Sequence, residues 1–235
     1  MSNIKKIVQS NSLAAAIALA AVCALPAHAA SVTVGNNVDP NCYPFSCLAS
    51  DLGGTGSTYQ QVYSSTAFSG PLSFNTISFF QSIPSLMDSA SYTISFSTTS
   101  AAVNGLDGVW ANNIGGDSQL FGTFNVSGSM PSVLSFTGNT FNYNPLAGNL
   151  LMHVDVFGLT ASNRYVSFFQ ADYTGIDTSR LYAYGGSPEG TLADGALRTE
   201  FSNMSAVPEP ETYAMMIAGL GLLGFAARRR KQKAV

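Results

Sequence analysis

The sequence predicts an all-β protein, built as a single antiparallel β-sandwich of jelly-roll-like type. Three observations lead to this fold class. Short runs in the middle of the chain alternate between apolar and small polar residues, which is the period of a half-buried strand. Clusters of Gly, Asn, Asp and Pro separate these runs, as turns do. No segment between the two ends of the chain shows a helical period, so sheets are the expected architecture.

The first 29 residues predict a secretory signal peptide. A start with two lysines leads into an apolar run at residues 13–25, and a small-x-small pattern ends at Ala29. We expect the secretion translocon to export the chain and signal peptidase to cut it between Ala29 and Ala30. A lipoprotein anchored at Cys23 is the alternative, although the residue before Cys23 is larger than lipid attachment prefers.

Cys42 and Cys47 remain after removal of the signal peptide. In an exported protein their close spacing favours a disulfide that closes a small loop. So small a ring contributes about 2 kcal/mol by its loop entropy, so we expect it to fix a local turn rather than hold the fold together. Half of a metal site is the alternative, but the sequence lacks a second Cys or His pair to complete four ligands. The surrounding residues 30–58 are expected to be irregular.

Residues 30–206 are expected to form the exported ectodomain. In residues 91–97, Tyr92, Ile94 and Phe96 fall on one face of a strand, and small hydroxyl residues fall on the other. Comparable runs predict further strands at about 59–68, 72–83, 119–127, 132–137, 140–143, 149–157, 163–171, 181–184 and 196–202.

Charge is scarce and unevenly distributed along the chain. Charged residues make up 10% of it, against about 25% in an average soluble protein. Residues 30–206 hold nine Asp, two Glu and three Arg, which is a formal charge of −8, and no lysine lies between Lys6 and Lys231. Such a surface repels a phosphate backbone, so nucleic acid is excluded as a partner of the ectodomain.

The C-terminal segment, residues 207–235, has three unlike features in a fixed order. A Pro-Glu-Pro motif comes first, an apolar and Gly-rich stretch follows at 213–227, and a basic end follows at 228–233. As a helix the apolar stretch is about 23 Å long, so it is a marginal transmembrane helix helped by snorkelling arginines. By the positive-inside rule the basic end stays cytoplasmic and the ectodomain lies outside. By its composition alone, the segment is either a permanent tail anchor or a processing signal.

This segment resembles the PEP-CTERM sorting tail of Gram-negative bacteria, a tail that has also been labelled the C-terminal domain of ice-binding proteins. The resemblance implies recognition by an exosortase, a membrane-embedded cysteine transpeptidase that removes the tail. It also implies an inner-membrane intermediate with its ectodomain in the periplasm, followed by display on the outer surface or in the extracellular matrix. Such proteins typically come from organisms that make exopolysaccharide and biofilm. The residues that carry the sorting and processing signal are Pro208, Glu209, Pro210, Arg228, Arg229 and Arg230.

Candidate catalytic groups are few, and each also has a structural interpretation. His153 and Asp155 share one face of a predicted strand, as a metal-binding or acid–base pair or as a hydrogen-bonded surface pair. Glycoside hydrolysis needs two carboxylates on either side of one bond. Glu189 lies in a predicted turn and Glu200 alternates with Arg198 on a late strand, which indicates structural roles for both. We therefore expect no enzymatic activity.

Loop aspartates are candidate calcium ligands. We select Asp172 and Asp177 as the candidate calcium-binding pair. Further side-chain oxygens in other predicted loops of this acidic domain come from Asp107, Asn113 and Asp117. None of them completes an EF-hand pattern. Ordinary turn aspartates are the alternative, and no cofactor is expected beyond this candidate calcium.

Aromatic residues in loops are candidate contacts for sugar rings. Trp110, the sole tryptophan, stands in a predicted loop beside two asparagines, and Tyr173 and Tyr182 are further candidates. A packing role for Trp110 is the alternative.

These features together predict a non-enzymatic protein of the cell surface or extracellular matrix that associates with exopolysaccharide and biofilm. A carbohydrate-binding module with a defined glycan ligand is the alternative, and a cryptic hydrolase that uses Asp155, Glu189 or Glu200 is a third possibility.

Overall fold

The computed structural model describes residues 30–47, 56–160 and 166–206, together with residue 219. The predicted signal peptide at 1–29 lies outside these residues, and so does the sorting tail at 207–235 except for residue 219. The predicted transmembrane helix at 213–227 and basic end at 228–233 belong to that tail. None of the helices in the described ranges is long and apolar enough to cross a membrane.

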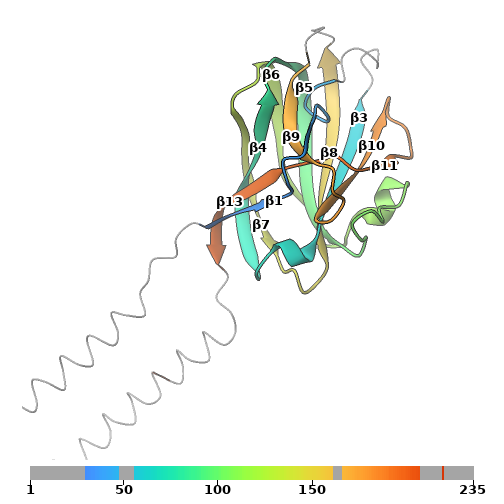
Figure 1. Ribbon diagram of the computed structural model, residues 1–235. Coiled ribbons are helices and arrows are strands. Elements are labelled where there is room, and N and C mark those ends of the chain that lie inside the picture. The colour runs from blue at the N-terminus through green and yellow to red at the C-terminus, as the bar shows by residue number, and fades with distance from the viewer. Residues whose placement is uncertain (1–29, 48–55, 161–165, 207–218, 220–235) are drawn as a thin grey trace, which may run out of the picture.

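One sheet of the ectodomain has seven strands, all paired antiparallel (Figure 1). Its main path runs β1–β13–β4–β9–β12, while β7 pairs with the other edge of β4, and β2 pairs with β9. The strands are β1 (Ala30–Val34), β2 (Asp39–Asn41), β4 (Leu72–Ile83), β7 (Val133–Tyr143), β9 (Phe168–Asp172), β12 (Ala196–Leu197) and β13 (Thr199–Ala206).

The second sheet has six strands in the order β11–β10–β3–β8–β5–β6, again antiparallel throughout. Two short 3₁₀ helices, η1 (Ser65–Ala67) and η2 (Trp110–Asn113), lie in the connections. The strands are β3 (Ser57–Tyr63), β5 (Leu86–Thr99), β6 (Gln119–Ser129), β8 (Asn149–Thr160), β10 (Thr178–Tyr184) and β11 (Thr191–Ala193).

The two antiparallel sheets confirm the predicted all-β class. β4 has the predicted bounds 72–83, and the run at 91–97 lies inside β5. The expectation that residues 30–58 are irregular is wrong for β1 and β2. These short strands pair with β13 and β9, more than a hundred residues away, so local sequence gives no sign of their partners. The jelly-roll-like topology stays a prediction.

Aromatic side chains fill the space between the sheets, which pack face to face. Phe74 on β4 lies 5.0 Å from Phe96 on β5, and Phe201 on β13 lies 5.1 Å from Tyr63 on β3, measured between ring centroids. Each of these pairs joins one sheet to the other. Burial raises the pKa of the Tyr63 phenol, which stays protonated and hydrogen-bonds to the Thr199 hydroxyl at 2.9 Å.

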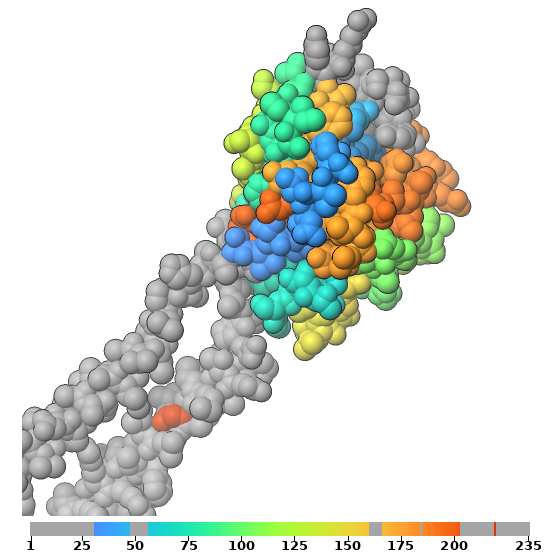
Figure 2. Space-filling view, viewed as in Figure 1, coloured from blue at the N-terminus to red at the C-terminus, as the bar shows by residue number. Residues whose placement is uncertain are grey.

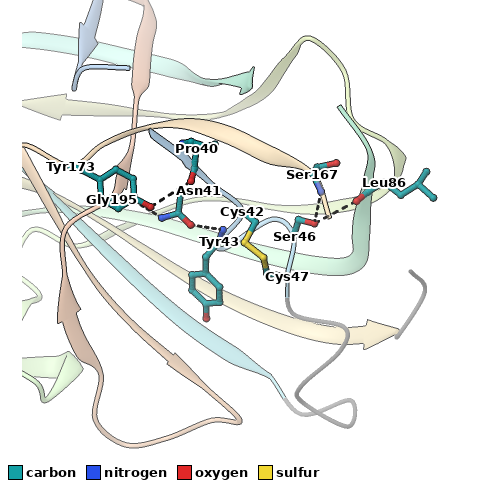
Figure 3. Close-up of a disulfide and its surroundings, with 10 residues drawn as sticks. All are labelled: Pro40, Asn41, Cys42, Tyr43, Ser46, Cys47, Leu86, Ser167, Tyr173 and Gly195. Carbon is teal, nitrogen blue, oxygen red and sulfur yellow. Dashed lines mark hydrogen bonds between the residues drawn. A yellow bond between two sulfur atoms is a disulfide. The ribbon is translucent and has the colours of Figure 1, made fainter. Parts of the chain in front are cut away.

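A small disulfide loop places two more rings in this core. Figure 3 shows the disulfide and the Tyr43 side chain. Cys42 and Cys47 are bonded, as their spacing predicts, with Cα atoms 5.7 Å apart. Tyr43 and Phe45, between the two cysteines, are 2% and 0% exposed. The loop backbone is joined to β5 by the Asp88 amide, which donates to the Phe45 carbonyl at 3.3 Å. The ring therefore fixes more than a local turn.

Phe45 contacts both sheets. Its ring centroid is 5.0 Å from that of Phe79 and 5.6 Å from that of Phe169 in the seven-stranded sheet, and 5.1 Å from that of Tyr92 in the six-stranded sheet. Tyr43 reaches a different part of the six-stranded sheet, because its hydroxyl donates to the Ala183 carbonyl at 2.9 Å. The loop thus acts as a plug between the layers.

Removal of the Phe45 ring from between the sheets is expected to destabilise the ectodomain. Phe45→Ala should lower the free energy of unfolding of the ectodomain by about 3–5 kcal/mol, since it leaves a cavity between two sheets. Denaturant unfolding followed by circular dichroism measures this change. Phe157→Ala is the matched control, because Phe157 is 54% exposed and its loss should change stability by less than about 0.5 kcal/mol. Equal losses for the two variants would contradict the assignment.

Candidate functional site

The outer face of the six-stranded sheet carries rows of polar side chains that cross its strands. Tyr59, Tyr92 and Val154 point into the core, so their neighbours along each strand point outward. The strand register aligns these outward residues in three rows, which we call the polar rows. They are Thr58, Asp155, Thr93 and Thr123; Gln60, His153 and Ser95; and Phe157, Ser91 and Asn125.

Hydrogen bonds between strands hold the polar rows in place. The hydroxyls of Thr93 and Thr123 are 3.0 Å apart, and the Ser91 hydroxyl donates to Asn125 Oδ1 at 2.5 Å. At the other side of the face, the Thr58 hydroxyl donates to Asp155 Oδ1 at 3.2 Å. The face is therefore an ordered array of hydroxyl, amide and carboxylate groups with few formal charges.

His153 and Asp155 form a hydrogen-bonded pair within this array. Nε2 of His153 lies 3.1 Å from Asp155 Oδ2, and Nδ1 lies 3.1 Å from the Gln60 amide nitrogen. The hydrogen bond from His153 holds the pKa of the Asp155 carboxyl below its ordinary value of 3.8, against the opposing effect of partial burial. Both ring nitrogens of His153 thus have partners on the same face.

The connection between β5 and β6 covers one end of the polar rows. Asn113, at the end of η2, donates from its amide to Gln60 Oε1 and to the Asp107 carbonyl, both at 2.8 Å. The Asp107 carboxylate accepts from the Val109 amide at 2.8 Å and from Asn112 at 3.0 Å, and these bonds lower its pKa. Asp107 and Asn113, both candidate calcium ligands, are therefore engaged in shaping this connection.

The Trp110 side chain packs on the protein and does not project into solvent. Its ring lies against the buried cluster of Val62, Leu106, Leu151 and Leu181, and its indole N–H donates to the Ser187 carbonyl at 3.1 Å. Leu181 and Tyr182 are successive residues of β10, so they point to opposite faces of the sheet. Tyr182 packs against the main core and lies 5.6 Å from Tyr43.

The three predicted glycan-contact rings therefore do not form one platform. Trp110 lies outside the six-stranded sheet, and Tyr182 lies on its inner side. Tyr173 is 38% exposed beside β2, and its hydroxyl donates to the Pro40 carbonyl at 3.5 Å.

Phe157 is an aromatic residue that the sequence interpretation missed. It is 54% exposed in the polar row that it shares with Ser91 and Asn125. The sequence does contain a signal for it. Alternate residues of a strand share a face, so Phe157 falls on the same face as His153 and Asp155. An exposed ring beside hydroxyl and amide groups suits the apolar face and polar edge of a sugar.

An open groove of about 620 Å³ adjoins the polar rows, between the edge strands β6 and β7. Thr123 and Asn125 belong to both the groove and the rows, and Ser127 and Ser135 extend its polar lining. Phe124 and Phe136, whose ring centroids are 4.9 Å apart, form part of its wall. The groove thus enlarges the surface that an extended chain with many hydroxyl groups can contact.

The candidate carboxylates of a hydrolase lie on different parts of the molecule. Asp155 is on the outer face of the six-stranded sheet. Glu200 pairs with Ser78 and Thr33 in the seven-stranded sheet, and it faces away from the core because Thr199 and Phe201 are buried. The core of both layers therefore separates Asp155 from Glu200. Glu189 lies in the connection before β11, where it forms a single bridge with Val109.

Asp172 is the buried member of the predicted calcium pair. Its Oδ1 accepts from the amide and hydroxyl of Thr174 at 2.8 and 2.6 Å, while Oδ2 is buried and has no hydrogen-bond partner among the described residues. Asp177 accepts from the Ser64 amide through its backbone carbonyl at 2.8 Å. In the part of the chain that the structure describes, no group of three or more His, Cys, Asp or Glu residues could hold a metal. Calcium at Asp172 and Asp177 stays a prediction.

The lowered pKa of Asp155 gives a pH test of the pair. Its stabilising contribution is present above the ordinary carboxyl pKa and is lost as the pH falls through the folded value. Asp155→Asn should therefore reduce the free energy of unfolding at pH 7 by about 0.5–1 kcal/mol, since water screens this partly exposed group. Near pH 3 the difference from the unchanged protein should shrink. Urea unfolding at both pH values measures it, and a difference independent of pH would contradict the pairing.

Comparison with known proteins identifies the segment that follows β13. None of the curated proteins matches the chain. Residues 206–231 match the family model of the PEP-CTERM protein-sorting motif. The match begins at Ala206, which is also the last residue of β13, so the motif follows the folded sheet directly. The chain carries a PEP-CTERM protein-sorting motif and is an exported protein that is targeted to an exosortase.

Proposed function

We propose that this exported protein is a non-enzymatic component of the cell surface or extracellular matrix that contacts exopolysaccharide in a biofilm. The single observation that supports the contact is the set of polar rows on the six-stranded sheet. Neutral polysaccharides present hydroxyl groups that exchange hydrogen bonds with such rows, and they need no positive charge on the protein. The sorting motif provides the route to the surface.

A domain with a formal charge of −8 at residues 30–206 has little attraction for an acidic polymer, so the polymer that fits is neutral or weakly charged. Phe157 adds a ring on which a sugar can stack. A carbohydrate-binding module with one defined glycan is the alternative function. This alternative is favoured by the regular arrangement of the polar rows. Cross-strand hydrogen bonds fix the spacing of their side chains, and a fixed spacing can discriminate between sugars.

A non-enzymatic role is supported by the placement of the acidic side chains. Asp155 and Glu200 face outward from different sheets, so they do not flank one bond as glycoside hydrolysis requires. His153, the remaining candidate for proton transfer, is engaged by Gln60 and Asp155.

Co-sedimentation of residues 30–206 with exopolysaccharide from the host tests the proposed contact. We expect saturable binding that Phe157→Ala weakens about tenfold, because removal of a stacking ring costs about 1–2 kcal/mol. Ile83→Ala is the control, since Ile83 is 47% exposed on the other sheet. Retention of full affinity by Phe157→Ala, or equal losses in both variants, would refute this binding surface.

The same assay with a chelator tests the candidate calcium. Asp172 lies on β9 in the seven-stranded sheet, whereas the proposed contact surface is on the six-stranded sheet, so binding should be unchanged when calcium is removed. Loss of binding on chelation would instead make the loop aspartates ligands.

Intact mass of the protein recovered from the native host tests the processing step. Because the motif directs the chain to an exosortase, the mature protein should lack Arg228, Arg229 and Arg230. It should also begin at Ala30. A mature mass that includes the basic end would contradict removal of the tail.

A further inference from the structure

Both ends of the described ectodomain lie at the same end of the seven-stranded sheet. Ala30, the first residue of β1, pairs with Met204, and Ala206, the last residue of β13, pairs with Leu72 of β4. Figure 1 shows β1 and β13 side by side. The sorting motif implies a membrane-anchored intermediate and begins at Ala206. This end of the sheet is therefore the one nearest the membrane.

The chain between the sheet and the membrane is short. Only residues 207–212 separate Ala206 from the predicted transmembrane helix that begins at Tyr213. Even when fully extended, such a segment spans at most about 20–25 Å. That reach is less than the length of a small domain, so the anchored ectodomain is held close to the bilayer surface.

Two loops flank this exit point. Leu72 pairs with Ala206 on one side and with Tyr143 on the other, so the loop before β4, residues 64–71, and the loop after β7, residues 144–148, lie next to it. The two segments adjoin each other at the lower end of the domain in Figure 2, in teal and yellow. Neither loop contains a charged residue, in contrast to the acidic ectodomain as a whole.

The second loop presents a leucine to solvent. Leu146 is 91% exposed, beside a groove of about 360 Å³ that Phe68, Pro71 and Pro145 help to line. The turn that carries it is fixed: Asn144 Oδ1 accepts from the Leu146 amide at 3.1 Å, and the Asn144 carbonyl accepts from the Ala147 amide at 3.0 Å. The Tyr143 hydroxyl also donates to the Gly148 carbonyl at 2.7 Å. Leu146 is thus held outward.

We propose that loops 64–71 and 144–148 form a lipid-docking surface on which the ectodomain rests in the membrane-anchored intermediate, with Leu146 at the bilayer interface. The proposal rests on the anchored intermediate that the sorting motif implies. An anionic lipid surface repels the acidic parts of the domain. The two loops carry no charge, so they can approach that surface without electrostatic repulsion. One inserted leucine is a weak anchor alone, but the tether supplies a high local concentration.

Fluorescence quenching in vesicles tests the docking surface. The unprocessed chain from Ala30 to Val235 is reconstituted into vesicles of phosphatidylethanolamine and phosphatidylglycerol that contain a headgroup spin label. An environment-sensitive dye is attached to Leu146→Cys, or to Val133→Cys as the control. Val133 is 42% exposed and pairs with Phe80, eight positions along β4 from Leu72, about 27 Å away. The dye at position 146 should be quenched severalfold more strongly than the dye at 133.

Each outcome is informative. Weak and equal quenching at both positions, in protein that floats with the vesicles, would overturn the docking surface and leave the anchored intermediate intact. Quenching at 146 that needs a co-reconstituted exosortase would overturn lipid as the occupant in favour of a protein contact. Failure to float would overturn the anchored intermediate and the proposal with it. As a second variant, Leu146→Asp should reduce quenching of a dye at Ala147→Cys without a change in melting temperature.

Discussion

Packing of aromatic rings between the two sheets is the interaction on which the rest of this structure depends. Phe45 lies against rings of both layers, and the disulfide from Cys42 to Cys47 closes the loop that carries it. A ring of this size removes little entropy from the unfolded chain, but here it orders a segment whose side chains complete the core. Because the core joins the layers so closely, the outer faces are left free to carry polar rows whose positions are fixed by strand register.

The outer faces follow from the scarcity of charge. A surface with few Lys, Arg, Asp and Glu must interact with water through hydroxyl and amide groups. In a sheet, such groups on neighbouring strands lie next to each other and form hydrogen bonds. The seven-stranded sheet shows the same solution, with Thr76 and Thr137 hydroxyls 3.0 Å apart and those of Ser78 and Ser135 2.8 Å apart. Both layers thus present outer faces with few charged groups and many hydrogen-bonding groups. Such a surface suits contact with other uncharged, hydroxyl-rich material better than recognition of an ionic ligand.

The sequence predicted strands correctly where apolar and polar residues alternate regularly. The bounds of β4 and the inward positions Tyr92, Ile94 and Phe96 could be derived in this way. Pairings could not, because β1 pairs with β13 at the opposite end of the ectodomain sequence. The same reason applies to the candidate site. The outward position of Phe157 could be derived from its alternation with buried residues of β8, as for His153 and Asp155. Trp110, in contrast, looks exposed in a loop by sequence, yet it packs on a cluster that includes residues of three strands. Burial of a single ring depends on what lies opposite it, and one sequence does not give that.

The position of β13 determines how the domain bears load. This strand ends at Ala206, where the sorting motif begins, and it is paired with β1 on one edge and with β4 on the other. A pull applied at Ala206 acts along the strand, while the hydrogen bonds of both ladders run perpendicular to it. Those bonds must then be sheared together rather than opened one after another from an end. A domain held by its C-terminal end against flow would thus meet the force with a strand that is paired along both of its edges.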